Sequence, residues 1–289
     1  MTAVTDLIGC VCGLTQHTPR VWNGSGHNLW CDGCGLFVRR ALPCDDDIEA
    51  RYRRDYWVEF SREQASTARD NIYRHTMARI HSRRGAPGTL VDVGCGAGRL
   101  LMYAQVRGWR AEGFELCEQA AEHGRARGAA IRLQSWLPCP LDSESVDAVT
   151  FINVLDHLPR PFDALTEAWR VLRPGGVLYV RVPNGPLHAQ LSRLASMARI
   201  PDFAILHLYG FGKQAFQCHL PRLGFTDVDV RTSPPTQSDA YEYPGLTGSL
   251  RRALKRMDYL GYTFSRFLGF DRLAWGLSVE VMAVKASCS

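Results

Sequence analysis

The sequence predicts an α/β fold in which a doubly wound, mostly parallel sheet is covered by helices on both faces. Near residue 89 a short apolar strand pattern runs into a glycine-rich turn and the start of a helix. Strand and helix patterns then alternate up to residue 183. Repeated units of this length produce parallel strands with crossover helices. In such sheets ligands bind beyond the carboxyl ends of the strands.

The composition is that of a globular protein with room for one full core and an appendage. The chain has 289 residues, of which 46% are hydrophobic. No uninterrupted apolar stretch approaches the ~20 residues of a membrane span, and the N-terminus lacks the pattern of a secretory signal. We therefore expect a cytoplasmic enzyme. The net charge of +5 is modest and spread along the chain, so it does not indicate a nucleic-acid partner.

Four cysteines near the N-terminus predict a zinc ribbon within residues 1–45. Without an export signal, ten cysteines favour metal binding or incidental burial over disulfides. Two short pairs separated by a loop can surround one tetrahedral Zn²⁺ ion with the thiolates of Cys10, Cys12, Cys31 and Cys34. The first pair has C-x-C spacing, which makes Cys10 the least secure ligand, with His17, His27 and Cys44 as substitutes. Such a closed site is structural, and the alternative is four reduced thiols without a metal.

The stretch "TLVDVGCGAGRLL" predicts a ligand site that takes no phosphate. Gly94, Gly96 and Gly98 form a tight turn that brings backbone N–H groups to the start of a helix. The spacing fits neither a phosphate loop nor a dinucleotide turn, whose third glycine would fall at Arg99. A carboxylate beside the turn would repel a pyrophosphate. Asp92 therefore indicates a ligand that carries an amine.

The elements after the turn bring further polar residues to the same edge of the sheet. Glu115 ends the strand expected at residues 109–115, where a carboxylate can accept hydrogen bonds from both hydroxyls of a ribose. Asn153 and Asn184 follow two later strands. The further elements expected in this part are strands at 130–133, 146–152 and 177–183 and a helix at 160–172.

The last two strands are expected at residues 225–232 and 277–286, with an insertion at about 234–276 between them. Apolar residues at helical spacing mark one face of a helix in the insertion: Leu250, Leu254, Met257, Leu260 and Phe264. Three roles stay open for it. It is a cover packed on the sheet or on a second subunit, a lid over the acceptor, or a basic membrane-surface helix through residues 250–264. The oligomeric state stays open as well.

The segments "VDVGCGAGRLL", Glu115 and "VDAVTFINVLDHLPRPFDALTEAWRVLRPGGVLYVRVPN" together resemble class I S-adenosylmethionine-dependent methyltransferases. The resemblance covers about Thr89 to Arg231 and implies a Rossmann-like methyltransferase domain over 89–289 with an antiparallel last strand. The ribbon and the following residues are similar to a subgroup with an N-terminal zinc ribbon. That subgroup methylates nucleotide-linked deoxysugars, surface glycans and antibiotics. Residues 46–88 would be a helical cover of the active site.

The resemblance implies a binding site for S-adenosylmethionine. Asp92 would bind near the amine of the cofactor, Glu115 would hold the ribose, and Leu116 would pack on the adenine. Relatives usually show Gly-Asp before the next loop, where this chain has Gln134-Ser135. Ser135 accepts weakly and Trp136 could stack on or close the pocket, so we expect weaker adenine discrimination. The implied cofactor-binding residues are Asp92, Gly94, Gly96, Gly98, Glu115, Leu116, Ser135, Trp136 and Asn153.

The loop "NVLDHLPRP" supplies the candidate catalytic base. Methylation of a hydroxyl or a carbon acid requires that a proton be removed. His157, with an ordinary pKa of ~6.5, suits that task, although it could instead pack against the cofactor or cap the next helix. Tyr209 and His207 follow as further catalytic candidates, in a segment where relatives show a second histidine in place of Gly210. In relatives, aromatic residues at the positions of Tyr52, Tyr56 and Trp57 line the acceptor pocket; the alternative is an amphipathic helix packed on the sheet.

The expected function is methyl transfer to a small molecule, by O- or C-methylation. The acceptor would be a sugar, nucleotide-linked or within a glycan, or an antibiotic or other natural-product scaffold. An RNA methyltransferase is the first alternative, which the modest charge and the absence of an Asn/Asp-Pro-Pro-aromatic motif disfavour. Methylation of a lipid-linked acceptor and a non-catalytic S-adenosylmethionine-binding protein are the others.

Overall fold

The structure is a computed structural model of the chain. It describes residues 20–22, 28–39, 45–197, 208–236 and 245–287. Three of the predicted site residues, Cys10, Cys12 and His207, lie outside these ranges.

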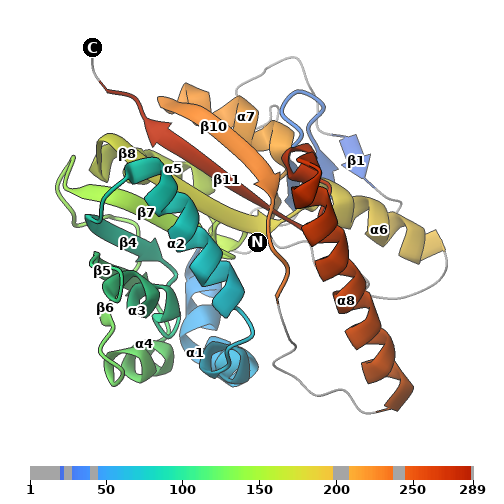
Figure 1. The fold of residues 1–289 in the computed structure, drawn as a ribbon, viewed down its shortest axis with the longest axis horizontal. Coiled ribbons are helices and arrows are strands. Elements are labelled where there is room, and N and C mark those ends of the chain that lie inside the picture. The colour runs from blue at the N-terminus through green and yellow to red at the C-terminus, as the bar shows by residue number, and fades with distance from the viewer. Residues whose placement is uncertain (1–19, 23–27, 40–44, 198–207, 237–244, 288–289) are drawn as a thin grey trace.

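Seven strands form the main sheet in the order β10-β11-β8-β7-β4-β5-β6 (Figure 1). Strand β11 runs antiparallel to both of its neighbours, whereas the pairs β8–β7, β7–β4, β4–β5 and β5–β6 are parallel. The expected mostly parallel sheet with an antiparallel last strand is therefore confirmed. The strands are β4 (Thr89–Val93), β5 (Arg110–Glu115), β6 (Ala130–Leu133), β7 (Val146–Ile152), β8 (Leu172–Pro183), β10 (Phe225–Thr232) and β11 (Ser278–Lys285).

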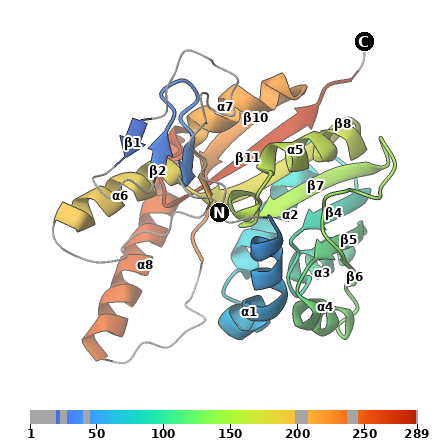
Figure 2. The same ribbon diagram turned by 180° about the vertical axis from the view of Figure 1, so that it is seen from behind.

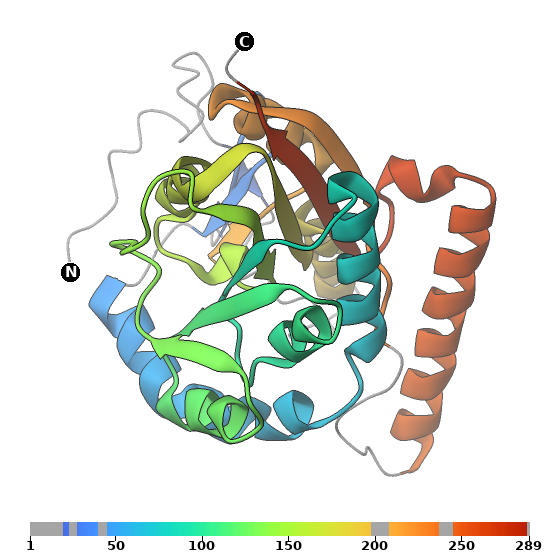
Figure 3. The same cartoon turned by 60° about the vertical axis from the view of Figure 1, so that its left-hand side comes forward.

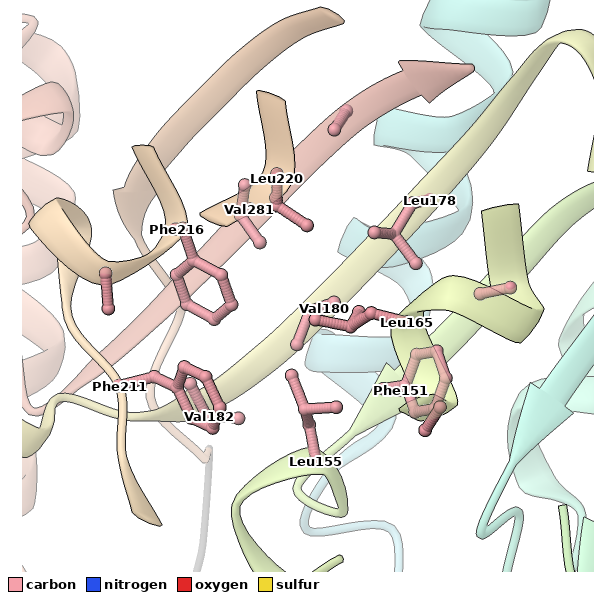
Figure 4. Close-up of a cluster of buried hydrophobic side chains, with 14 of the residues drawn as sticks. Phe151, Leu155, Leu165, Leu178, Val180, Val182, Phe211, Phe216, Leu220 and Val281 are labelled. Atoms are coloured by element: carbon pink, nitrogen blue, oxygen red, sulfur yellow. The ribbon is translucent and has the colours of Figure 1, made fainter. Parts of the chain in front are cut away.

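Helices cover both faces of this sheet because its strands are apolar on both sides. On one face Leu178 and Val180 of β8 pack with Leu165, Phe216 and Leu220 from the covering helices (Figure 4). Those helices are α5 (Pro161–Val171) and α7 (Lys213–Arg222). The alternate residues of β8 face a second buried cluster, which is covered by α2 (Asp70–Arg84), α3 (Arg99–Gln105) and α4 (Glu118–Arg125). This two-residue period places side chains of one strand in two cores.

A small antiparallel sheet joins the N-terminal segment to a distant part of the chain. Its strands are β1 (Arg20–Trp22), β2 (Asn28–Trp30), β3 (Phe37–Arg39) and β9 (Tyr209–Gly210), and it lies beside α6 (Gly185–Met197) and α7 (Figures 1 and 2). Between β2 and β3 the chain turns at Gly35, whose N–H donates to the Cys31 carbonyl at 2.8 Å and whose φ is +69°. The pairing with β9 was not predicted, because a two-residue strand carries no periodic signal.

The remaining helices lie around the edge of the sheet. They are α1 (Asp45–Ala65), α8 (Gly245–Phe267) and the short helices η1 (Leu155–His157) and η2 (Phe270–Leu273). Helix α8 extends along the outer side of the molecule (Figures 1 and 3). Its apolar side chains Met257, Leu260 and Phe264 are about two-thirds exposed, so this face does not pack on the sheet. In the described ranges, no helix combines the length and apolar character that crossing a bilayer requires.

Candidate active site

A cavity of about 740 Å³ opens at the carboxyl ends of the parallel strands, within the size range of small-molecule sites. Its walls come from the ends of β4, β5, β7 and β8, from α1, from the loop after β6, and from Asp258 of α8. Of the nine implied cofactor-binding residues, seven line the cavity: Asp92, Gly94, Glu115, Leu116, Ser135, Trp136 and Asn153.

Asp92 lies near the end of β4, where its carboxyl group is buried and therefore harder to ionise. Its side chain is 4% exposed, and the Thr150 hydroxyl donates to Oδ1 at 2.6 Å. Burial raises the pKa of Asp92 to about 7, Glu115 adds to the rise, and the Thr150 hydrogen bond opposes it. A cation placed against Asp92 would favour the ionised form, so the site suits an amine.

The three glycines of the turn have different tasks. All have positive φ, at +67° for Gly94, +54° for Gly96 and +69° for Gly98. Gly94 lines the cavity. A Cβ on Gly96 would lie 2.3 Å from the Gln64 Oε1, and one on Gly98 would lie 2.6 Å from the Ala129 Cβ. Gly96 and Gly98 therefore allow the turn to close against its neighbours, and they do not line the cavity.

Glu115 is fixed by the backbone around it. Its Oε2 accepts from the Gly96 N–H at 2.8 Å, and its Oε1 accepts from the N–H groups of Leu116 and Cys117, each at 2.8 Å. Burial raises the pKa of Glu115, and these three hydrogen bonds counteract the rise. The carboxylate therefore joins the glycine turn to the end of β5 and lines the cavity in a defined orientation.

The loop after β6 forms a wall of the cavity with help from α1. Trp136 is 3% exposed, its indole N–H donates to the Ala164 carbonyl at 3.1 Å, and its ring meets Phe114 edge to face at 5.1 Å. This side chain is part of the core and not a movable lid. The Ser135 hydroxyl donates to Glu49 of α1 at 3.3 Å. Glu49 was not predicted, although it shares a helix face with Tyr52 and Tyr56 by spacing.

The candidate base His157 also lines the cavity. Tyr52 Oη and His157 Nδ1 share a hydrogen bond of 2.5 Å, and His157 Nε2 lies 3.9 Å from Asp156 Oδ2. Asp156 is buried, which raises its pKa to about 7. Tyr56 also lines the cavity, and its hydroxyl accepts from the Gln64 amide at 2.6 Å. Trp57 instead packs against His123, with ring centroids 5.0 Å apart, outside the lining.

The structure does not bring Tyr209 to the cavity. Its side chain is 7% exposed, its hydroxyl donates to the Pro159 carbonyl at 3.0 Å, and it belongs to the buried cluster that includes Val38 of β3 and Phe216 of α7. Asn153, by contrast, lines the cavity and accepts a hydrogen bond from Arg181.

Three arginines line the cavity, Arg69, Arg160 and Arg181, and the sequence assigned a role to none of them. Arg69, just before α2, pairs with Glu63 at 2.7 Å, and its Nε is a buried donor without a hydrogen-bond partner among the described residues. Arg181 lies on β8. The only signal for Arg181 was a charged residue inside the apolar run "VLYVRVP".

The described half of the predicted zinc ribbon is a buried turn. Cys31 is 2% exposed and Cys34 is fully buried. Within the ranges that the structure describes, no three potential metal-ligand side chains lie together. The partners expected for this pair, Cys10 and Cys12, fall outside those ranges.

Comparisons with known proteins find similarity to methyltransferases. A family model described as "Methyltransferase domain" matches residues 91–180. A protein of Mycolicibacterium smegmatis named "probable S-adenosylmethionine-dependent methyltransferase" is 34% identical over 105 residues, which are 36% of this chain and 41% of that protein. A ubiquinone biosynthesis O-methyltransferase of Methylococcus capsulatus is 33% identical over 108 residues, which are 35% of this chain and 46% of that protein. The chain thus spans less than half the length of these curated relatives.

The fold agrees with this match. The solved structure of the 1,6-didemethyltoxoflavin-N1-methyltransferase of Burkholderia thailandensis superposes with a TM-score of 0.55 at 16% identity, over 93% of this chain and 99% of that one. A specific likeness to zinc-ribbon sugar methyltransferases is not confirmed by these matches. Residues 91–180 thus match a methyltransferase domain model, and the seven-stranded sheet that contains them, with its antiparallel β11, agrees in fold with that solved methyltransferase.

Proposed function

We propose that the protein transfers a methyl group from S-adenosylmethionine to a small-molecule acceptor by O- or C-methylation. One observation carries the proposal. A single cavity has Asp92, Gly94 and Glu115 in its wall and also the hydrogen-bonded pair of Tyr52 and His157. The cavity is therefore able to hold a cofactor and an acceptor next to each other.

The cavity residues fit the polar groups of S-adenosylmethionine. Asp92 would accept from the amine, Glu115 from the ribose hydroxyls, and Glu49 beside Ser135 from the adenine amino group. The buried Nε of Arg69 lacks a partner in the described residues, and the guanidinium suits the carboxylate of the cofactor. When bound, the cofactor supplies an electrophilic methyl group.

His157 is proposed as the base that removes the proton of an acceptor hydroxyl or acidic C–H group. When Nδ1–H donates to the Tyr52 oxygen, Nε2 carries the lone pair and can accept that proton. The Asp156 carboxylate, 3.9 Å from Nε2, would then stabilise the imidazolium. Tyr52 orients the ring and does not itself need to move a proton.

The acceptor is proposed to be a sugar or another cyclic natural-product scaffold with a hydroxyl group. Tyr52, Tyr56 and Phe60 lie on one side of α1 and line the cavity. Aromatic rings offer a flat apolar wall for a pyranose or an aromatic acceptor.

The test is transfer of a radiolabelled methyl group from the cofactor to an extract of the source cells. After separation into water-soluble small molecules, lipids, and nucleic acid with protein, label in the first fraction supports the proposal. Glu115→Ala should abolish it. Glu112→Ala is the matched control, since Glu112 is on the same strand and pairs with Arg132 at 3.0 Å outside the cavity. Label in RNA, or binding of the cofactor without any transfer, would contradict the proposal.

A lipid-linked acceptor is the second candidate, and the exposed face of α8 favours it. Met257, Leu260, Phe264 and Phe267 are 65% to 86% exposed, while Asp258 of the same helix lines the cavity. The segment 245–277 contains six Lys or Arg and two Asp residues. A basic helix with an exposed apolar face binds anionic membrane surfaces. Sedimentation with phosphatidylglycerol vesicles tests this: Phe264→Ser with Phe267→Ser should abolish binding, and binding that these changes leave intact would refute it.

We also propose that residues 1–45 form a zinc ribbon with Cys10, Cys12, Cys31 and Cys34 as ligands. The burial of Cys31 and Cys34 on one tight turn supports this proposal. Metal analysis of the protein purified with zinc present should give one Zn²⁺ per chain. Cys31→Ser should lose the metal. Cys95→Ser, which changes a buried cysteine within the glycine turn, should keep it. Wild-type protein without zinc would contradict the ribbon.

A further inference from the structure

Arg181 is a buried cation in the wall of the cavity. Its side chain is on β8, is 5% exposed and lines the cavity. Removing a guanidinium from water costs several kcal/mol, by order of magnitude, unless an anion compensates for the lost solvation. The partners of Arg181 therefore indicate whether the protein itself supplies that anion.

The hydrogen-bond partners of Arg181 are all neutral. Its Nε donates to the Ser233 hydroxyl at 2.8 Å, one terminal nitrogen donates to the Pro234 carbonyl at 3.3 Å, and the other donates to the Asn153 amide oxygen. Among the residues that the structure describes, no carboxylate forms an ion pair with it. A guanidinium has five N–H donors, so about two remain after these three bonds.

The nearest candidate counter-ion on the sheet is occupied by other groups. Glu280 faces Arg181 across the β8–β11 ladder. Its Oε1 bonds to His75 at 2.9 Å and its Oε2 accepts from the Tyr179 hydroxyl at 2.7 Å, while Arg79 lies 3.6 Å away. Asp258 of α8 also lines the cavity, but it is not an ion-pair partner of Arg181.

The cofactor does not account for this charge either. Strand β8 is separated from β4 by β7, which places the Arg181 backbone about 10 Å from β4, since neighbouring strands are about 4.8 Å apart. A cofactor that contacts both Asp92 and Glu115 would extend from the end of β4 towards the end of β5. That direction leads away from β8 and Arg181. Three arginines line the cavity, and Arg181 is the buried one among them. S-adenosylmethionine has one carboxylate, for which Arg69, with its unpartnered Nε, is the better placed partner.

We propose that Arg181 is the anion-binding residue of the acceptor subsite, so that the acceptor of this enzyme carries a carboxylate or a phosphate group. Ser233, Pro234 and Asn153 fix the plane of the guanidinium, and its remaining N–H groups bind the anion. This inference rests on the proposed methyltransferase function and narrows its substrate class. It favours a nucleotide-linked sugar or a carboxylated scaffold over a neutral glycan.

The test measures anion binding and does not depend on turnover. Protein saturated with S-adenosylhomocysteine is titrated calorimetrically with benzoate, with methyl phosphate and with neutral benzamide. Benzoate or methyl phosphate should bind at least about tenfold more tightly than benzamide, equivalent to about 1.4 kcal/mol. The tighter of the two anions identifies the source of the charge. This comparison uses wild-type protein and needs no variant to fold.

Two variants then assign the effect to Arg181. Arg181→Met should abolish the preference for the anion and leave the Kd of S-adenosylhomocysteine within about twofold, whereas Arg181→Lys should retain part of the preference. The control is Arg173→Met on the same strand, because Arg173 pairs with Asp147 at 2.9 Å and lies outside the cavity lining. It should behave as wild type.

Three results would overturn the inference. Wild-type protein that binds both anions no better than benzamide has no anion subsite. An anion preference that survives in Arg181→Met comes from another residue. A loss of cofactor affinity beyond about tenfold in Arg181→Met would assign Arg181 to the carboxylate of the cofactor. If instead the anions bind through Arg181 but no labelled methyl group is transferred to any acceptor, the proposed enzymatic function fails while the anion site stands.

Discussion

At the scale of single residues, the site depends on carboxyl groups that burial makes difficult to ionise. Burial raises the pKa of both Asp92 and Asp156 to about 7, with Glu115 adding to the effect on Asp92. Both groups therefore change charge near neutral pH, where a surface aspartate would be fully ionised. Cofactor binding should therefore depend on pH through Asp92, and catalysis should depend on pH through Asp156 beside His157.

Cofactor affinity should increase as the pH rises from 6 to 8. Below about 7 the free protein holds a proton on Asp92, which must leave before the carboxylate can bind a protonated amine. The Kd of S-adenosylhomocysteine should therefore fall by up to about tenfold per pH unit below the pKa and level off above it. Titration calorimetry between pH 5.5 and 8.5 measures this. Asp92→Asn should bind weakly and independently of pH; an unchanged pH profile in that variant would assign the dependence to another group.

The pair of Tyr52 and His157 should affect the chemical step more than cofactor binding. His157→Gln removes the lone pair that accepts the proton, so the single-turnover rate should fall by about 10² to 10⁴. Tyr52→Phe keeps the imidazole base but removes the hydrogen bond that orients it. The single-turnover rate should therefore fall less than in His157→Gln, and the pH profile of that rate should shift. Quench-flow measurement of labelled product, with cofactor affinity measured in parallel, separates the two steps. Full activity in His157→Gln would exclude it as the base.

At the scale of elements, a buried ion cluster helps to hold α2 against the sheet. His75 and Arg79 of α2 contact Glu280 of β11, which is 1% exposed and also accepts from Tyr179. Burial alone would raise the pKa of Glu280, but His75, Arg79 and Tyr179 together hold that pKa below its usual value. Because α2 begins one residue after Arg69, this cluster also positions one of the cavity arginines.

Glu280→Gln should destabilise the fold strongly. It leaves His75 without its carboxylate partner and Arg79 with Asp229 alone, and breaking a buried pair in this way costs about 3–5 kcal/mol. Because the folded-state pKa is lowered, the stabilisation by Glu280 is complete above the unfolded pKa of ~4.3 and is lost as the pH falls through the folded value. Urea unfolding at pH 7 and pH 4 measures both effects. Glu167→Gln, which breaks a partly exposed pair with Arg170, should cost about 0.5 kcal/mol; equal losses would refute the cluster's role.

At the scale of the whole molecule, the sequence predicted those elements whose apolar residues form a recognisable pattern within a short stretch of chain. The strands at 146–152 and 225–232 were predicted with their observed bounds, because apolar runs between turn residues specify buried strands. Strand β8 begins at Leu172 and not at residue 177, because Leu172 pairs with Val146 of β7. Pairing with a distant strand is a tertiary effect that no sequence window contains.

The residues of the candidate site also fall into those that the sequence predicted and those that it did not. Asp92, Glu115 and His157 were predictable because each lies at or just after the carboxyl end of a strand, at the edge of the sheet where the cavity opens. Glu49, Arg69 and Arg181 were not, because each reaches the cavity through packing: one from α1, one from the start of α2, and one from inside an apolar strand. Tyr209 was placed by resemblance, and β9 instead directs its hydroxyl to Pro159.

The central claim is that this cavity binds S-adenosylmethionine, and calorimetric titration tests it most directly. Wild-type protein should bind one molecule of S-adenosylmethionine per chain. Glu115→Ala should weaken the affinity by at least about tenfold, since its carboxylate lines the cavity and fixes the glycine turn, whereas Glu112→Ala should bind as wild type does. Folded wild-type protein that binds no S-adenosylmethionine, or a Glu115→Ala variant with undiminished affinity, would contradict the account.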